Sequence, residues 1–186
     1  MIPNDRAFNG KPTFEDNGKT YYRSYRIERT GKFRLIIGVV SINSEYRQAI
    51  AFSLSNNPKF NGAIFINGTQ LIPEKKKQHY VMPVELPDKS RIVMDLDVTE
   101  GYFMLANASD FLDDYPDLIE KISAQTGRSR EEFRGNSYTS GFTAANRYGN
   151  SFYIEQLSEN KYRFYCNDHK MDDDFDDLVF DMEITD

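Results

Sequence analysis

The sequence predicts an all-β fold: an antiparallel β-sandwich of jelly-roll type with a short helical insertion around residues 115–134. Two observations lead to this prediction. From residue 21 onward, short apolar runs recur between turn residues every 8–14 positions, which is the rhythm of an antiparallel sandwich or barrel. Within the runs, apolar and polar side chains alternate, as they do on strands that bury one face.

The clearest local signals are two hairpins and a central strand. Asn67-Gly68 lies between two apolar runs and readily supplies the two positive φ values of a type I′ turn, so the flanking runs should pair. Residues 33–40 carry apolar side chains on both faces, which predicts a strand in the middle of a sheet. Near the C-terminus, residues 161–166 and 178–184 both alternate, and we expect them to pair across the loop between them.

Length and composition predict a single domain over residues 1–186, because the chain is long enough to bury a sizeable core and 39% of it is hydrophobic. Residues 1–18, rich in Pro, Asn and Gly, are expected to form an irregular N-terminal arm. Residues 110–150 break the strand pattern. They contain a predicted helix that starts at Pro116 and stops at Gly127, so we interpret them as a helical and loop insertion between strands.

The single cysteine, Cys166, excludes an internal disulfide and a cysteine-based zinc cluster. Its place in an alternating strand predicts a small buried side chain. The N-terminus lacks a basic segment followed by an apolar one, and no apolar stretch reaches the roughly 20 residues of a membrane span. We therefore expect no membrane span and a cytoplasmic location; if the N-terminus has been trimmed, an extracellular location is expected instead.

The strongest chemical signal is a dense acidic loop near the C-terminus. Nine of the last twenty residues are acidic and one is lysine, so the rest of the chain is close to neutral. Six aspartates lie between Asp168 and Asp177, and their mutual repulsion must be offset by water, by basic neighbours or by a bound cation. If the cation is calcium, the candidate ligands are Asn167, Asp168, Asp172, Asp174, Asp176 and Asp177. The alternative is a solvated hairpin loop whose aspartates cap backbone N–H groups.

The spacing of Asp172, Asp174 and Asp176 lets one loop direct several carboxylate oxygens at a calcium ion. It does not predict an EF-hand. Asp177 stands at the sixth position, where an EF-hand needs Gly. The residues after it alternate as a strand, where an EF-hand has a helix. The pattern therefore favours a loop site at the edge of a sandwich.

The stretch Asp172-Asp-Asp-Phe-Asp-Asp-Leu-Val-Phe180 resembles a motif, D-x-D-F-[ND]-D-x-V-F, of a family of bacterial β-sandwich domains of unknown function. In that family the motif precedes the last strand and Asn usually stands at the position of Asp176. The resemblance covers about ten residues. It implies a sandwich, an ordered acidic turn and calcium, in a family common among secreted or surface proteins. The general strand plan is also similar to galactose-binding-like jelly rolls.

A second candidate site is the stretch 135–150, which is rich in Tyr, Ser, Gly and Asn. Paratopes use this mixture, because Tyr gives a large contact area at low entropic cost while the small polar residues adapt their hydrogen bonds. The expected ligand-binding residues are Tyr138, Asn146, Arg147 and Tyr148. The alternative is an ordered surface crossover that binds nothing.

Together these features favour a non-catalytic recognition module, stabilised by calcium, that binds a carbohydrate or a protein surface. Two alternatives stay open: a structural or protein–protein interaction protein whose acidic loop is only solvated, and a carboxylate-based hydrolase. The sequence has only two histidines and no Gly-x-Ser-x-Gly elbow, which argues against a nucleophilic enzyme. Basic and aromatic residues interleave over residues 19–34, but the acidic C-terminus argues against a nucleic-acid partner.

Overall fold

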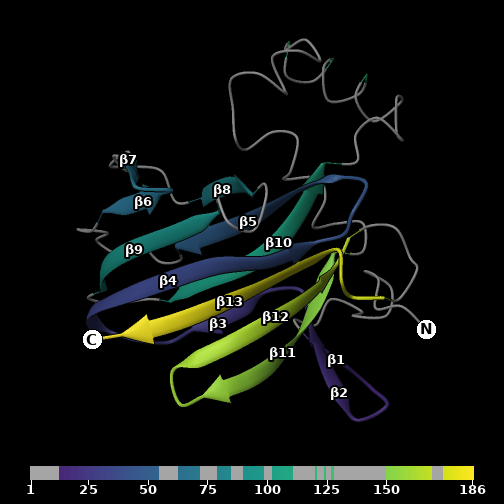
Figure 1. The fold of residues 1–186 in the computed structure, drawn as a ribbon, viewed down its shortest axis with the longest axis horizontal. Coiled ribbons are helices and arrows are strands. Elements are labelled where there is room, and N and C mark those ends of the chain that lie inside the picture. Colours follow the sequence, from purple (N-terminus) through teal and green to yellow (C-terminus); the bar gives the residue numbers. More distant parts are fainter. Residues whose placement is uncertain are drawn as a thin grey trace.

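The protein is an antiparallel β-sandwich, as predicted, and Figure 1 shows its two sheets in a computed structural model. Every strand pairing among the described residues is antiparallel. The structure describes residues 13–54, 63–71, 79–84, 90–98, 102–110, 120, 124, 127, 150–168 and 174–186.

The larger sheet has nine strands in the order β1-β2-β11-β12-β13-β4-β9-β6-β7. Their bounds, in that order, are Thr13–Asp16, Lys19–Tyr22, Ser151–Ser158, Lys161–Asn167, Leu178–Thr185, Gly31–Ile42, Arg91–Val98, Ile64–Ile66 and Thr69–Leu71. The smaller sheet has four strands in the order β3-β10-β5-β8. These are Tyr25–Ile27, Phe103–Asp110, Arg47–Leu54 and His79–Val84.

The core lies between the two sheets, and every second side chain of each alternating strand points into it. In β4, Phe33, Leu35 and Ile37 are at most 3% exposed, while the residues between them face outward. Phenylalanine rings fill the centre: the rings of Phe164 and Phe180, on neighbouring strands, stack at 4.6 Å between centroids. Burial of this apolar surface is the main force that holds the sheets together.

Three local predictions are confirmed. Asn67 and Gly68 have φ values of 49° and 79° and connect β6 to β7 as a hairpin. β12 and β13 pair from Lys161↔Glu183 to Cys166↔Leu178. The long strand β4 lies between β13 and β9, inside the larger sheet.

The N-terminal arm differs from the prediction over its last residues. Residues 13–16 form β1, which pairs with β2 across a turn at Asn17 and Gly18, whose φ values are 48° and 76°. This is the same Asn-Gly signal that predicted the β6–β7 hairpin. The surrounding Pro, Gly and Asn residues of the arm concealed it in the sequence.

The helix expected around residues 115–134 lies, apart from Glu120, Ala124 and Gly127, outside the described residues, as does most of the 110–150 insertion. Within the part of the chain that the structure describes, no helix has the length and hydrophobicity of a membrane span.

The stacked phenylalanine pair gives a direct test of the core. Phe164 is fully buried, so Phe164→Ala should lower the free energy of unfolding by about 3–5 kcal/mol in chemical denaturation. As a control, Val40→Ala removes a side chain that is 40% exposed and should change stability by at most about 0.5 kcal/mol. Equal losses in the two variants would contradict this core.

Candidate functional site at the polar end of the sandwich

The apolar core stops at one end of the sandwich, where buried polar side chains replace it. These side chains come from both sheets and are at most 4% exposed: Gln48, Asn107, Ser109, Asn150, Ser151, Asn167, Asp168 and Asp177. Cross-strand pairing brings them together, because Gln48 faces Ser109 and Ser151 faces Asn167. Asn107 Nδ2 of the four-stranded sheet donates to the carbonyl oxygen of Asn167 in the nine-stranded sheet at 2.9 Å. We call this group the polar end.

The acidic loop is closed at its base by hydrogen bonds within the polar end. The backbone N–H of Asp168 donates to Asp177 Oδ2 at 2.8 Å, which joins the two ends of the loop. Ser44 Oγ, from the segment after β4, donates to Asp168 Oδ2 at 2.5 Å. The backbone N–H of Asn43 donates to the carbonyl oxygen of Asp177 at 3.1 Å. The two aspartates at the base are therefore parts of the folded framework.

Asp174 and Asp176, which precede Asp177 in the loop, are more exposed than the two aspartates at the base. Asn43 Nδ2 donates to Asp176 Oδ2 at 2.9 Å, and the Asp176 N–H lies 3.5 Å from Asp174 Oδ1. The other Asp176 oxygen, Oδ1, is buried and has no hydrogen-bond partner among the described residues. Asp174 is exposed. Asp172, which the sequence also proposed as a ligand, lies outside the described residues.

Phe175 fixes the acidic loop to the outer face of the nine-stranded sheet. Its φ is 55°, a left-handed conformation that costs a non-glycine residue roughly 1–2 kcal/mol. The strain is offset by packing, because the ring is only 6% exposed and lies 5.1 Å from the ring of Tyr21 and 5.6 Å from that of Tyr153. The loop and the sheet face under it thus form one continuous surface.

Tyr21, Tyr153 and Tyr165 form a row across β2, β11 and β12, which we call the tyrosine row. Tyr153 and Tyr165 stack at 4.7 Å with an angle of 11°, and Tyr21 meets Tyr153 edge to face at 84°. Lys19 Nζ lies 4.2 Å from the centre of the Tyr153 ring. A separation of 4.7 Å between near-parallel rings matches the spacing of neighbouring strands, so these two rings stand upright with their faces turned to each other.

Charged groups continue the tyrosine row along the outer face. Tyr165 Oη donates to Glu155 at 2.8 Å, and this hydrogen bond, together with burial, raises the pKa of Tyr165. Arg163 donates to both oxygens of Asp181, at 2.7 and 3.1 Å, and Lys161 lies 3.4 Å from the same carboxylate. Burial raises the pKa of Asp181, but the hydrogen bonds and positive charges of Arg163 and Lys161 outweigh burial and lower it.

Cys166 is buried, as predicted, and it is not a nucleophile. Its exposure is 0%, and desolvation, helped by the negative charge of Asp177, raises the pKa of the thiol well above its usual value. The group therefore stays protonated at neutral pH, whereas nucleophilic cysteines need a lowered pKa and access to substrate.

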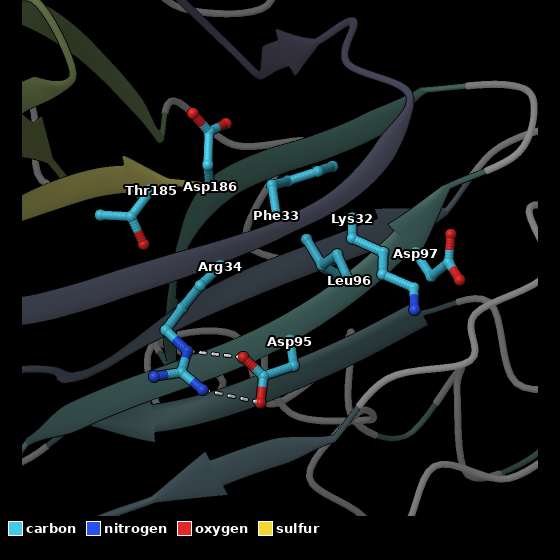
Figure 2. A pocket seen from close by; sticks show the side chains of 8 residues that line it. All are labelled: Lys32, Phe33, Arg34, Asp95, Leu96, Asp97, Thr185 and Asp186. Atoms are coloured by element: carbon cyan, nitrogen blue, oxygen red, sulfur yellow. Dashed lines mark hydrogen bonds and ion pairs between the residues drawn. The ribbon is translucent and has the colours of Figure 1, made fainter.

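An open hollow of about 710 Å³ lies elsewhere on the sandwich, at the start of β4 and the end of β9 (Figure 2). Lys32, Arg34, Asp95, Asp97, Thr185 and Asp186 line it, over Phe33 and Leu96. Figure 2 shows Arg34 donating to both Asp95 oxygens, at 2.6 and 3.1 Å. Arg34 pairs with Asp95 and Arg29 pairs with Asp186, so two of the three carboxylates that line the hollow are engaged in ion pairs.

The sequence found the carboxylates of the polar end but missed their neutral partners. Asn167, Asp168 and Asp177 come together at the base of the loop, and Asp174 and Asp176 precede Asp177 in more exposed positions. Among the described residues, no three His, Cys, Asp or Glu side chains converge as metal ligands. The sequence could have indicated Gln48 and Asn107 as buried polar residues. Each stands at an inward-facing position of a strand whose inward-facing side chains are mostly apolar. Tyr138, Asn146, Arg147 and Tyr148 lie outside the described residues.

Comparison with protein-family models, with curated proteins and with solved structures finds no match to this chain. Functional inference therefore depends on the residues of the polar end and of the outer face.

The Arg163–Asp181 pair should give the protein a defined acid sensitivity. Because the folded pKa of Asp181 lies below that of the unfolded chain, the carboxylate stabilises the fold above the ordinary Asp pKa of about 3.9, and the contribution disappears as pH falls through the folded pKa. We expect Asp181→Asn to lower the free energy of unfolding by about 1–2 kcal/mol at pH 7, with wild type and variant converging in acid.

Asp95→Asn serves as the control for this measurement, because the Arg34–Asp95 pair is more exposed and screened by solvent. Urea denaturation at a series of pH values gives both curves. A constant gap between wild type and Asp181→Asn over the whole pH range would show that the carboxylate charge is not the source of the stabilisation.

Proposed function

We propose that this chain is a non-catalytic recognition module, stabilised by calcium at its acidic loop, that binds a protein surface with the outer face of its nine-stranded sheet. The observation that carries the proposal is the burial of Phe175 against Tyr21 and Tyr153. This contact makes the acidic loop part of the same face as the tyrosine row, so a cation that orders the loop also orders the recognition surface.

The composition of the face supports a protein partner. Tyr and Arg are enriched in the central regions of protein interfaces, and both occur here beside exposed apolar side chains such as Val40 and Leu157. A carbohydrate would need a free aromatic face for stacking, whereas the faces of Tyr153 are occupied by Tyr165 and Lys19. The upright rings offer edges and hydroxyl groups, which suit hydrogen bonding to a partner chain.

The acidic loop supports a hard cation. Asp168 and Asp177 are both buried, and the Asp168 backbone N–H donates to the Asp177 carboxylate at the base of the loop. Calcium is bound by carboxylate oxygens of this kind. Neutral side-chain oxygens lie buried at the same end of the sandwich, among them Asn107 Oδ1 and Ser151 Oγ. Calcium accepts such mixed sets of six to eight oxygens, whereas magnesium demands a small octahedral shell and sheds water reluctantly.

Calcium should therefore raise the melting temperature. A cation that binds only the folded state at ten times its Kd stabilises by about 1.4 kcal/mol, which corresponds to roughly 3–5 °C for a domain of this length. Magnesium should raise it less, and Asp168→Asn should reduce the calcium effect. Differential scanning calorimetry after chelation, with sodium chloride at matched ionic strength as the control, makes the test. If calcium does no more than sodium chloride, the acidic loop is merely solvated.

The recognition face is tested separately with the double variant Tyr153→Ser/Tyr165→Ser. Wild type and variant are used to probe a displayed protein library and a glycan array, both in calcium. We expect protein binders whose affinity falls at least tenfold for the double variant, because interface tyrosines contribute strongly to binding. Glycan binders lost in the same variant would assign the face to carbohydrate. Binders retained by the variant would show that recognition lies elsewhere on the molecule.

A further inference from the structure

The side-chain amide oxygens of Gln48 and Asn107, both buried at the polar end, have no hydrogen-bond partner among the described residues. Gln48 is 1% exposed and Asn107 is fully buried, and the oxygens concerned are Gln48 Oε1 and Asn107 Oδ1. A buried polar atom without a partner is costly, and native proteins nearly always supply one, as a protein group, an ordered water or an ion. These two oxygens therefore require an occupant.

The orientation of both amides is fixed by what their nitrogens contact. Gln48 Nε2 donates to the carbonyl oxygen of Tyr46 at 3.2 Å, and Asn107 Nδ2 donates to the carbonyl oxygen of Asn167 at 2.9 Å. A carbonyl oxygen can only accept, so turning either amide over would place two acceptors against each other. The unpartnered atoms are thus oxygens and not nitrogens, which is the condition for binding a cation.

Both amides belong to the hydrogen-bonded network of the acidic loop. The carbonyl oxygen that Asn107 contacts belongs to Asn167, the residue before Asp168. The Tyr46 backbone, which holds Gln48, donates its N–H to Ser44 Oγ at 2.9 Å, and Ser44 Oγ in turn donates to Asp168. The two oxygens of the four-stranded sheet and the Asp168 carboxylate, which follows β12, therefore belong to side chains of one hydrogen-bonded network at the same end of the interior.

We propose that calcium binds inside the sandwich at this end, held by Gln48 Oε1, Asn107 Oδ1 and the Asp168 carboxylate. The inference rests on the calcium-stabilised module proposed above and names the ligands of its ion, which lie in the interior and not on the exposed D-x-D segment of the loop. A carboxylate can accept about four hydrogen bonds or metal contacts, so Asp168 can accept from Ser44 and bind an ion at the same time. Neutral amide oxygens are ordinary calcium ligands, which explains how a site can exist without three converging acidic side chains among the described residues.

Such an ion would join the two sheets where the apolar core ends. Its ligands come from β5, from β10 and from the residue after β12, three segments far apart in the chain. The cation would then compensate both the buried carboxylate and the amide oxygens that lack a hydrogen-bond partner. Magnesium fits less well, because it retains several waters and the ligand residues here are buried.

The test uses Gln48→Met and Asn107→Leu, which replace each amide by an apolar group of similar size. Isothermal titration of chelator-treated protein with calcium should give a Kd at least tenfold weaker in each variant. In chelator, Gln48→Met should melt at or above the wild-type temperature, because the unpartnered oxygen is gone; in calcium it should melt below wild type. This reversal of order between the two conditions is specific to a ligand role, and an oxygen that only holds water would not produce it.

Ile50→Val is the matched control, because it alters packing on the same face of β5 without removing an oxygen, and its calcium Kd should equal that of wild type. Asp174→Asn tests whether calcium binds instead at the exposed D-x-D segment of the loop. If Asp174→Asn weakens calcium binding at least tenfold while Gln48→Met and Asn107→Leu do not, the interior site is wrong and the calcium-stabilised module stands. If wild type itself binds no calcium, both proposals fail.

Discussion

The closure of the acidic loop at its base is the interaction on which the rest of the polar end depends. The Asp168 backbone donates to the Asp177 side chain, and the Asn43 backbone donates to the Asp177 carbonyl. These two contacts tie β12, β13 and the end of β4 together at the point where the apolar core stops. They also keep two buried aspartates, Asp168 and Asp177, at this end of the sandwich, and burying a carboxylate is favourable only when surrounding dipoles or a cation compensate it.

From this closure follow both the position of Phe175 and the shape of the outer face. With the loop ends fixed, Phe175 takes a left-handed conformation and packs on the tyrosine row. A register shift between Val179 and Phe180 leaves Val40 out of the ladder between β13 and β4. Such bulges redirect strands and side chains near functional regions, and here Val40 projects to solvent. The strained Phe175 and the bulge in β13 therefore both shape the outer face of the nine-stranded sheet.

The sequence predicted the strands better than the site, for a physical reason. Period-2 alternation and an Asn-Gly pair depend on local residues alone, so the β6–β7 and β12–β13 hairpins could be predicted, and the Asn17-Gly18 turn could have been. The polar end depends on residues distant in sequence, such as Asn107 contacting Asn167, which no local pattern reports. The acid-rich composition pointed to the loop. It could not show which aspartates are buried in the folded structure and which are exposed.

The most direct test of this description is amide hydrogen exchange at Asp168, a buried residue whose N–H is bonded to Asp177 Oδ2. In calcium we expect the Asp168 amide to exchange as slowly as the central amides of β12 and β13. In chelator we expect the Asp168 amide to exchange faster, while the exchange rates of those core amides change little. Exchange at the rate of an open loop in both conditions would contradict a closed base, and equal protection in both would contradict stabilisation of that base by calcium.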